Sequence, residues 1–374
     1  MKKVSRRSFA KKVGLGIGSA SILPTLVSFE NCLPKMNAPY AGKKLNVALC
    51  GLGRYANILA NGLAASEFCT LTGIITGTPA KATSWQRKYR IPAKNIYDYG
   101  NFDNIATNED IDLVYIVLPN GMHKEYAIRA AEAGKHVIVE KPMAINASEA
   151  LEIITACRKA NVQLAVGYRL HFEPYNMEMK RLGQEKVFGQ VRHVQASLGY
   201  RVTPDVSDWH LKKSLSGGGA LQNLGVYCIQ AARYITGEEP ISVTAQFGPT
   251  EHKAEYKEVE ESIHWQMEFP SGAFATCSSS YNYGIDRLYA AADTGEFELS
   301  PAISYGPFVG KSSNGPMNFP QINQQQTQMD ELAKFLLNNK SFPVHISGEE
   351  GYKDMKVIDA IYMAAETGNT IDLS

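Results

Sequence analysis

Apolar runs and segments of helical spacing alternate through residues 45–167. The runs are apolar on both faces, as parallel strands covered by helices are, and apolar residues recur every three or four positions between them. The predicted strands are residues 45–50, 70–76, 113–118, 136–139 and 163–167, with clear helices at 124–133 and 148–160. This alternation predicts an α/β domain of the Rossmann type, in which helices cover both faces of a parallel sheet.

A different pattern follows residue 168. Strands are predicted at residues 191–200, 241–247, 262–269, 273–280 and 296–299, and helices at 219–235, 324–337 and 349–366. The alternation in Ile263-His264-Trp265-Gln266-Met267 indicates a strand with one solvated face. Because 374 residues exceed the size at which one core keeps growing, we predict two domains.

The first 44 residues fit neither pattern. Lysines and arginines precede an apolar, glycine-rich stretch at residues 13–29, which is the order of an export signal, and Ser5-Arg6-Arg7-Ser8 resembles the twin-arginine motif. We predict an export signal at residues 1–30, an extended arm at 31–44, and a periplasmic protein exported by the twin-arginine machinery. The stretch is short for a membrane span and rich in Gly and Ser, so we expect no stable span in the mature protein.

Charge and cysteine content narrow the function classes. The 38 lysines and arginines nearly balance the 37 acidic residues, for a formal net charge of +1, which argues against nucleic acid as a partner. The six cysteines are scattered, without CxxC pairs or histidines at ligand spacing, so we predict no metal site.

The first strand leads into a glycine-rich turn and then a helix. Cys50-Gly51-Leu52-Gly53-Arg54-Tyr55-Ala56 follows the apolar run, with Ala56 where a third glycine often stands. Glycines there allow a tight turn and a close approach of the backbone to a pyrophosphate at the helix N-terminus. The motif therefore predicts a dinucleotide cofactor.

The end of the second strand bears on the choice of cofactor. An NAD site usually offers a carboxylate there for the ribose, whereas this chain has Thr76, Gly77 and Thr78, with Lys81 one turn further and Arg54 in the first loop. Hydroxyls and cations suit a 2′-phosphate, so NADP is favoured and NAD stays possible. The alternative is that Lys81 and Arg54 are solvated surface charges.

Further polar residues follow the next strands of the same sheet. Because the carboxyl ends of parallel strands meet at one edge, Asn120, His123, Glu140 and Lys141 are expected to lie together at the ligand crevice. A carboxylate next to Lys141 is as easily a structural ion pair as a base, so we expect Glu140 to position the strand end or the ribose.

Several motifs, taken in order and spacing, carry a family resemblance from residue 45 onward. They are Gly51-Leu52-Gly53-Arg54-Tyr55-Ala56, Leu118-Pro119-Asn120, His123, Glu140-Lys141-Pro142, Gly167-Tyr168-Arg169 and Gly217-Gly218-Gly219 followed by Asn223-Leu224-Gly225-Val226-Tyr227. The chain resembles the glucose-fructose oxidoreductase, inositol dehydrogenase and rhizopine-catabolism (Gfo/Idh/MocA) family, most of all its periplasmic glucose-fructose branch. This resemblance implies a Rossmann domain at residues 45–167. It also implies an α+β domain at 168–374 with a large, mostly antiparallel open sheet that binds substrate and supports a homodimer or homotetramer.

The resemblance also implies roles for individual residues. Lys141 and Tyr227 are the expected catalytic pair, a lysine that stabilises developing negative charge and a tyrosine that relays a proton. The expected substrate-binding residues are Tyr168, Arg169, Trp209, His210 and Asn223. The expected cofactor-binding residues are Gly51, Leu52, Gly53, Arg54, Tyr55, Thr76, Lys81, Leu118, Asn120, His123, Glu140, Lys141 and Arg169. Asn223 departs from the pattern, because the family usually has an aspartate four residues before the relay.

The leading hypothesis is an exported, NADP-dependent sugar oxidoreductase that keeps its cofactor bound and moves hydride between sugars. A second hypothesis is a glycosidase that transiently oxidises C3, eliminates the aglycone and has no net redox change. A third, which Asn223 permits, is a protein that binds cofactor and sugar without turnover.

Overall fold

The computed structural model describes residues 42–205 and 207–373. The segment Lys43–Ser374 forms one compact unit. The predicted export signal and most of the predicted arm lie outside the described residues. Within the described part, none of the helices has the length and apolar character needed to cross a membrane.

The first sheet has six parallel strands in the order β3-β2-β1-β4-β5-β6. The strands are β1 (Leu45–Cys50), β2 (Cys69–Ile75), β3 (Ile96–Tyr97), β4 (Leu113–Ile116), β5 (His136–Val139) and β6 (Leu164–Val166). The helices between them are α2 (Arg54–Ala65), α3 (Pro79–Tyr89), α4 (His123–Glu132) and α5 (Ala147–Lys159). This strand order confirms the predicted Rossmann domain, and its ligand crevice is expected where the order reverses, between β1 and β4.

The second sheet has nine strands in the order β14-β13-β12-β11-β7-β10-β9-β8-β15, and only the β7–β10 pair is parallel. The strands are β7 (Val191–Gly199), β8 (Ser242–Phe247), β9 (Ser262–Glu268), β10 (Phe274–Ser280), β11 (Ile285–Ala292), β12 (Glu296–Leu299), β13 (Gly310–Ser312), β14 (Gly315–Pro316) and β15 (Ile371–Asp372). The predicted α+β domain with a mostly antiparallel sheet is confirmed.

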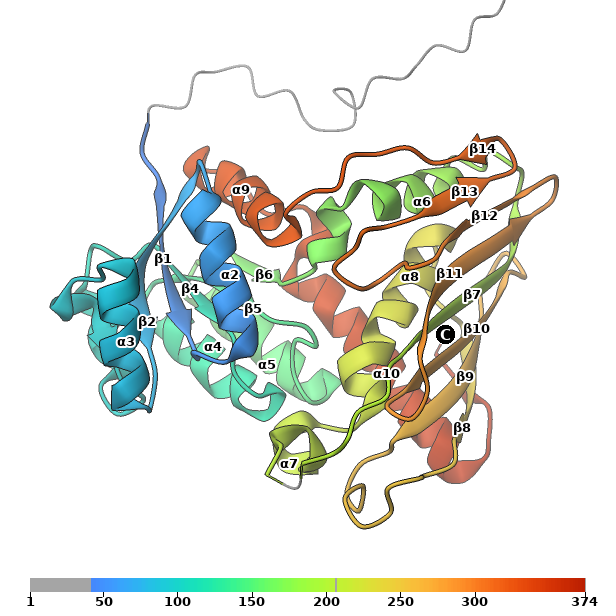
Figure 1. The fold of residues 1–374 in the computed structure, drawn as a ribbon, viewed down its shortest axis with the longest axis horizontal. Helices are drawn as coiled ribbons and strands as arrows, with labels where there is room; N and C mark the ends of the chain where they lie inside the picture. The colour runs from blue at the N-terminus through green and yellow to red at the C-terminus, as the bar shows by residue number, and fades with distance from the viewer. Residues whose placement is uncertain (1–41, 206, 374) are drawn as a thin grey trace, which may run out of the picture. The chain divides into compact units, whose positions relative to one another are not determined.

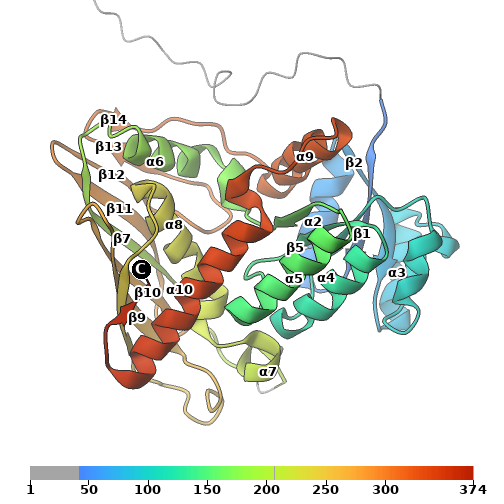
Figure 2. The same cartoon turned by 180° about the vertical axis from the view of Figure 1, so that it is seen from behind.

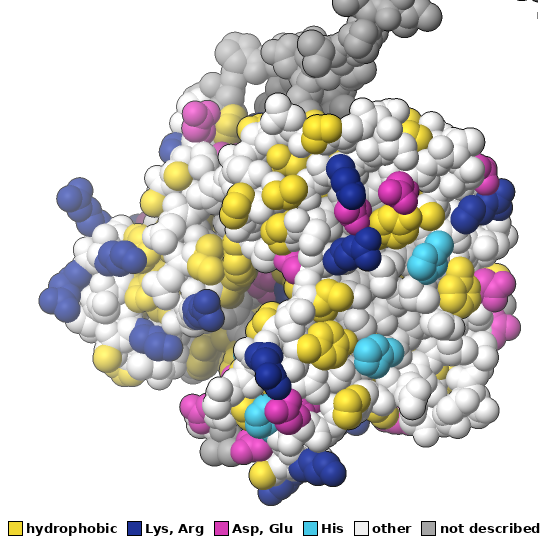
Figure 3. Space-filling model, turned by 45° about the vertical axis from the view of Figure 1, so that its right-hand side comes forward, with side chains coloured by type: hydrophobic (Ala, Val, Ile, Leu, Met, Phe, Trp, Pro, Cys, Tyr) yellow, Lys and Arg dark blue, Asp and Glu magenta, His cyan; other side chains and the backbone are white. Residues whose placement is uncertain are grey.

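Helices cover one face of this second sheet, on the side of the first domain. They are α6 (Pro174–Gln184), α8 (Val226–Thr236) and α10 (Gly348–Thr367), and Figures 1 and 2 show them between the two sheets. Helix α10 packs against both α5 and β8, so it ties the two domains together. Figure 3 shows the face of the sheet that these helices leave uncovered, where hydrophobic and charged side chains and histidines are interspersed.

Helix α9 (Gln324–Leu337) returns from the second half of the chain to the first domain. It packs against α2, and Met329 and Leu332 join the same buried cluster as Leu49 and Leu59. The two helices approach closely at Gly62, where a Cβ would lie only 2.9 Å from the backbone nitrogen of Gln326. The Rossmann domain is thus completed by residues far beyond position 167.

Candidate active site

The glycine turn after β1 has the shape of a phosphate site. Gly51 has φ of 97°, and a Cβ there would lie 2.4 Å from the carbonyl oxygen of Val117, so only glycine fits. Gly53 caps α2 without a side-chain bond, the first turn has no acidic residue, and a Cβ at Gly53 would meet no atom within 4 Å. The free N–H groups of α2 therefore face open space beside Leu52, and these residues fit a dinucleotide pyrophosphate.

The end of β2 carries no carboxylate. Thr76 is buried, and its Oγ1 accepts a hydrogen bond from the Thr78 backbone nitrogen at 3.3 Å. Arg54 and Lys81 are exposed, and no hydrogen bond or ion pair holds either side chain among residues 42–205 and 207–373. The Arg54 and Lys81 side chains are thus both available to a 2′-phosphate. Within the described residues, no contact joins the two side chains to each other.

His123 and Asn120 brace the loops that follow β4 and β5. The Nε2 of His123 lies 2.8 Å from the carbonyl oxygen of Leu118 and its Nδ1 lies 3.0 Å from that of Pro142. Burial lowers the pKa of His123 to about 4. Asn120 donates from Nδ2 to the Ser216 carbonyl oxygen at 2.8 Å, next to α7 (Lys213–Ser216). Both side chains are occupied by backbone carbonyls, so they position the crevice wall.

Glu140 is buried directly after β5, and hydrogen bonds hold both of its carboxylate oxygens. Its Oε1 accepts a hydrogen bond from the Tyr115 hydroxyl, which in turn accepts one from Gln328 Nε2 at 2.9 Å. Its Oε2 accepts one from the Lys141 backbone nitrogen at 3.2 Å. Burial raises the pKa of Glu140. These contacts fit the positioning role expected for this carboxylate and fix the backbone that carries Lys141.

Lys141 meets Asn223 and Tyr227 at the centre of the crevice. Its Nζ donates to the Asn223 carbonyl oxygen at 2.8 Å and to Asn223 Oδ1 at 3.4 Å, and it lies 4.6 Å from the centre of the Tyr227 ring. The Asn223 Nδ2 donates to the Tyr281 hydroxyl at 2.7 Å. Burial lowers the pKa of Lys141, with a smaller contribution from the Arg169 charge. The structure thus brings Lys141 of one motif together with Asn223 and Tyr227 of another.

A π-helical turn (Leu221–Gly225) precedes α8 and delivers Asn223 to Lys141. The Glu260 carboxylate accepts hydrogen bonds from the backbone nitrogens of Gly219 at 2.9 Å and Leu221 at 2.8 Å. A Cβ at Gly219 would lie 1.8 Å from the Glu260 carbonyl oxygen, which explains a glycine at this position. Such π-turns inside helices often occur at functional sites.

Arg169, at the start of a 3₁₀ turn after β6 (Arg169–Phe172), is almost fully buried. Its guanidinium carbon lies 5.1 Å from the Tyr227 ring centre and 4.6 Å from that of Tyr305. Burial raises the pKa of Tyr227, and the Arg169 charge opposes that rise. The Nε of Arg169 is buried and has no hydrogen-bond partner in the described part of the chain.

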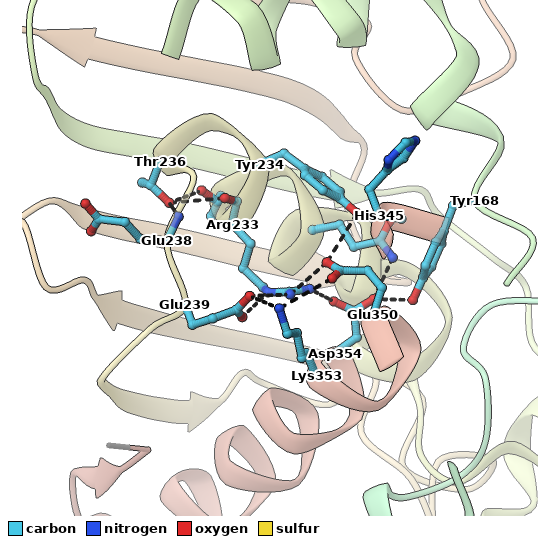
Figure 4. A network of polar contacts seen from close by, with 12 residues as sticks. Tyr168, Arg233, Tyr234, Thr236, Glu238, Glu239, His345, Glu350, Lys353 and Asp354 are labelled. Atoms are coloured by element: carbon cyan, nitrogen blue, oxygen red, sulfur yellow. Dashed lines mark hydrogen bonds and ion pairs between the residues drawn. The ribbon is translucent and has the colours of Figure 1, made fainter. Parts of the chain in front are cut away.

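Tyr168 lies behind this site and does not face it. Its side chain is 2% exposed, and its hydroxyl donates to Asp354 Oδ2 at 2.5 Å. Figure 4 shows this contact within a network in which Arg233 pairs with Glu239, Glu350 and Asp354. The hydroxyl is therefore not available to a sugar, and the structure gives Tyr168 a supporting role in place of the substrate contact predicted above.

Asp354→Asn is expected to lower the free energy of unfolding by about 3 kcal/mol, because it removes one charge from a buried ion pair. Denaturant unfolding followed by fluorescence measures this. Glu349→Gln is the control: it breaks an exposed pair with Arg158 and is expected to cost at most about 1 kcal/mol. Equal stability losses in the two variants would contradict a structural role for the buried network.

Trp209 and His210 lie on a short 3₁₀ turn (Trp209–Leu211) before α7. Their rings stack with centres 3.8 Å apart, and His210 Nδ1 lies 2.5 Å from Asp208 Oδ1. Within the described residues, no hydrogen bond or ring contact joins either side chain to the crevice residues. Their predicted contact with substrate stays a prediction.

Sequence reasoning missed three tyrosines at the site. Tyr281 accepts the hydrogen bond from Asn223, its ring lies 5.8 Å from that of Tyr200, and Tyr305 covers Arg169. Tyr55, predicted from the glycine motif, is near enough to Glu140 and Tyr227 for their charges to add to the burial that raises its pKa. The missed tyrosines follow β7, β10 and β12 in loops without a motif, so no sequence signal marked them.

Comparisons with known proteins agree with this geometry. Residues 45–168 match the family described as "Oxidoreductase family, NAD-binding Rossmann fold", and residues 176–298 match the "GFO/IDH/MocA C-terminal domain". The aldose-aldose oxidoreductase of Caulobacter crescentus, solved with glycerol, is 38% identical, with a TM-score of 0.85 over 88% of this chain and 100% of that one. This chain belongs to the Gfo/Idh/MocA family. The resemblance seen in the motifs is confirmed, and the chain is an oxidoreductase with an NAD(P)-binding Rossmann domain.

Other Gfo/Idh/MocA members are more distant. The "D-xylose 1-dehydrogenase [NADP(+)]" of Haloarcula marismortui is 27% identical over 321 residues, 83% of this chain and 87% of the relative. The "D-glucoside 3-dehydrogenase" of Escherichia coli is 26% identical over 372 residues, 90% of this chain and 100% of the relative. The names of these relatives refer to different sugars, so they define a class of activity and not one substrate.

Proposed function

We propose that this protein is an exported, NADP-dependent oxidoreductase that moves hydride between sugars while its cofactor stays bound. The observation that carries the proposal is the meeting of Lys141, Asn223 and Tyr227 at the edge of the Rossmann sheet where β1 also leads into the glycine turn. The aldose-aldose oxidoreductase relative supports an exchange between two sugars. A nicotinamide, when bound, supplies the site that accepts or gives hydride.

The chain's own residues would bind the cofactor and handle the proton. Gly51, Gly53 and the N-terminus of α2 would hold the pyrophosphate, with Thr76 and Lys81 toward a 2′-phosphate. Lys141 would stabilise charge that develops on the sugar oxygen. Burial brings its pKa down toward neutrality, so the Lys141–Tyr227 pair can take the hydroxyl proton in oxidation and return it in reduction.

Identifying the retained nucleotide tests this proposal directly. The purified, dialysed protein is denatured, and the released nucleotide is identified by mass spectrometry and absorbance. We expect stoichiometric NADP(H). Released NAD(H) would contradict the phosphate role of Thr76 and Lys81, and no nucleotide would contradict a retained cofactor.

Lys81→Ala is expected to weaken NADP binding at least about tenfold, the value of one charge-assisted hydrogen bond, and to leave NAD binding unchanged. Calorimetric titration of protein stripped of nucleotide measures both affinities. Lys88→Ala is the matched control. Lys88 is a lysine at the other end of the same helix, and its ammonium lies over the Tyr89 ring. Its loss should leave the affinity for both nucleotides unchanged. Equal losses for NADP and NAD would refute phosphate recognition by Lys81.

Asn223→Asp is expected to shift the pH profile upward by about 1 to 3 units, because a carboxylate beside the Lys141 ammonium favours its charged form and raises its pKa. Sugar oxidation, which needs an acceptor for the proton, should then fall at neutral pH. Initial rates across pH 5–10 measure the shift. Tyr281→Phe is the control, since it removes the other partner of the Asn223 amide without adding charge. An unshifted Asp profile would contradict the coupling to Lys141.

The D-glucoside 3-dehydrogenase relative favours a second candidate, a glycosidase that works through transient oxidation at C3. Release of nitrophenol from a nitrophenyl glucoside without added oxidant would support it. Consumption of one sugar matched to reduction of another would support the first candidate. A protein that binds nucleotide and sugar but turns over neither would be the third possibility.

Export and assembly complete the proposal. Arg6 and Arg7 support a twin-arginine signal, and replacing both with lysine should retain the protein in the cytoplasm. Phe247 and Phe274, both more than a third exposed on the second sheet, support a homodimer or homotetramer. Light scattering that finds only monomer would remove the oligomer.

A further inference from the structure

A loop between β12 and β13 presents Tyr305 over the crevice. Tyr305 is 56% exposed, whereas Arg169, which its ring contacts, is almost fully buried. One side of its ring is against Arg169, whose guanidinium carbon also lies near Tyr227. The guanidinium therefore links the exposed ring to the predicted proton relay.

The backbone that carries Tyr305 is fixed by two charged side chains. The Asp286 carboxylate accepts hydrogen bonds from the backbone nitrogens of Ala302 and Ile303 at 2.8 Å and of Ser304 at 3.0 Å. From the other side, buried Arg169 donates to the carbonyl oxygens of Ile303 and Ser304. The ring is thus held in place before any ligand arrives, which reduces the entropy lost when it is used for binding.

Tyr305 also interacts electrostatically with residues of both halves of the site. The charges of Tyr227, Arg169, Glu140 and Arg54 all act on its pKa, which partial desolvation raises to about 12. Arg54 opens α2 in the cofactor turn, whereas Tyr227 belongs to the predicted relay. Tyr200, 44% exposed just after β7, interacts electrostatically with Tyr305 and shares two of its partners, Tyr227 and Arg54.

We propose that Tyr305 is a specificity-determining residue whose ring stacks on the apolar C–H face of a pyranose. This inference rests on the proposed function and names the substrate form that the site selects. A flat, fixed aromatic ring offers its largest contact area to a flat partner, and a closed sugar ring has such a face where an open chain does not.

The test compares oxidation of an aldopyranose, D-xylose, at its C1 hydroxyl with NADP+ as hydride acceptor, with reduction of glyceraldehyde by NADPH; glyceraldehyde is too short to close a pyranose ring. Tyr305→Ala is expected to lower kcat/KM for D-xylose at least tenfold, mainly through KM, and to change kcat/KM for glyceraldehyde less than twofold. Tyr305→Phe should retain both. Met363→Ala, which truncates an exposed apolar side chain on α10, should change neither.

Calorimetric binding of D-xylose to each variant separates this inference from the function on which it rests. Wild-type protein that binds D-xylose but does not turn it over would contradict the proposed function, and a tenfold affinity loss in Tyr305→Ala would still support the stacking role. Unchanged affinity and kinetics in Tyr305→Ala would overturn the inference. An equal loss for both substrates, or loss of the bound nucleotide, would also overturn it by showing a structural role.

Discussion

Replacing Lys141 with methionine is expected to lower kcat for sugar oxidation by at least about 10³-fold, because both charge stabilisation and proton handling are lost. Methionine keeps the length of the side chain. It removes the donor to the Asn223 carbonyl oxygen, but that oxygen lies in the site where ligand binds and can accept a hydrogen bond there. We therefore expect the fold and nucleotide binding to survive. Thermal unfolding and the amount of bound nucleotide check this alongside steady-state rates.

Lys135→Met is the matched control for this variant. Lys135 is also largely buried, and its Nζ donates to a backbone carbonyl oxygen, that of Asn108 at 2.7 Å, away from the crevice. It is expected to affect stability more than rate. If Lys141→Met kept more than half of the wild-type kcat, Lys141 would have no part in the chemistry, and the protein without turnover would become the better description.

Gly51→Ala is expected to abolish nucleotide binding and to destabilise the fold, whereas Gly53→Ala should affect binding alone. A Cβ at Gly51 would collide with the Val117 carbonyl oxygen, and its φ of 97° suits glycine. The left-handed backbone alone costs a residue with a Cβ about 1 to 2 kcal/mol, and the collision adds to that. Gly53 has neither constraint, but its free space is where a pyrophosphate would approach the backbone.

The two glycine variants separate folding from binding. Denaturant unfolding of nucleotide-free protein should show a loss for Gly51→Ala and wild-type stability for Gly53→Ala. Calorimetry should then show NADP affinity lowered more than about tenfold for Gly53→Ala, since several backbone N–H contacts depend on close approach. Wild-type NADP affinity in Gly53→Ala would place the pyrophosphate elsewhere.

The Rossmann sheet could be predicted because its strands are buried on both faces. All four residues of β4 are buried, so the continuous apolar run at 113–118 predicts a strand even though polar residues do not alternate with apolar ones. The strand itself ends at Ile116. The rule that carboxyl ends of parallel strands meet then predicts Glu140 and Lys141 at the same sheet edge as the glycine turn, and β1, β4 and β5 are neighbouring parallel strands.

Strand β11 was missed because its pattern is weak. Only Leu288 and Ala290 are buried in it, and Asp286 and Arg287 interrupt its start. Helix α6 was missed too: Pro174 occupies its first turn and its cap is the Glu173 side chain, which accepts from the backbone nitrogens of Tyr175 and Asn176. Neither a helix cap nor an interrupted strand produces the regular spacing of apolar residues from which helices and strands are predicted.

Long-range contacts decided the rest of the site. Tyr168 follows a predicted strand as a site residue should, but Asp354, 186 positions later, takes its hydroxyl. Tyr305 depends on Asp286 and Arg169, which no spacing in the chain connects to it. Helix caps and strand ends can be predicted from neighbouring residues in the sequence. The roles of Tyr168 and Tyr305 depend instead on where α10 and the β12–β13 loop pack.

The most direct test of the proposed function is a paired assay with dialysed protein and no added nucleotide, in which one aldose is supplied for oxidation and a second for reduction. We expect the oxidised product of the first to form in equal amounts with the alditol of the second, at many turnovers per bound nucleotide. Product formation only when free NADP is added, or from neither sugar, would contradict an oxidoreductase that exchanges hydride between sugars through a retained cofactor.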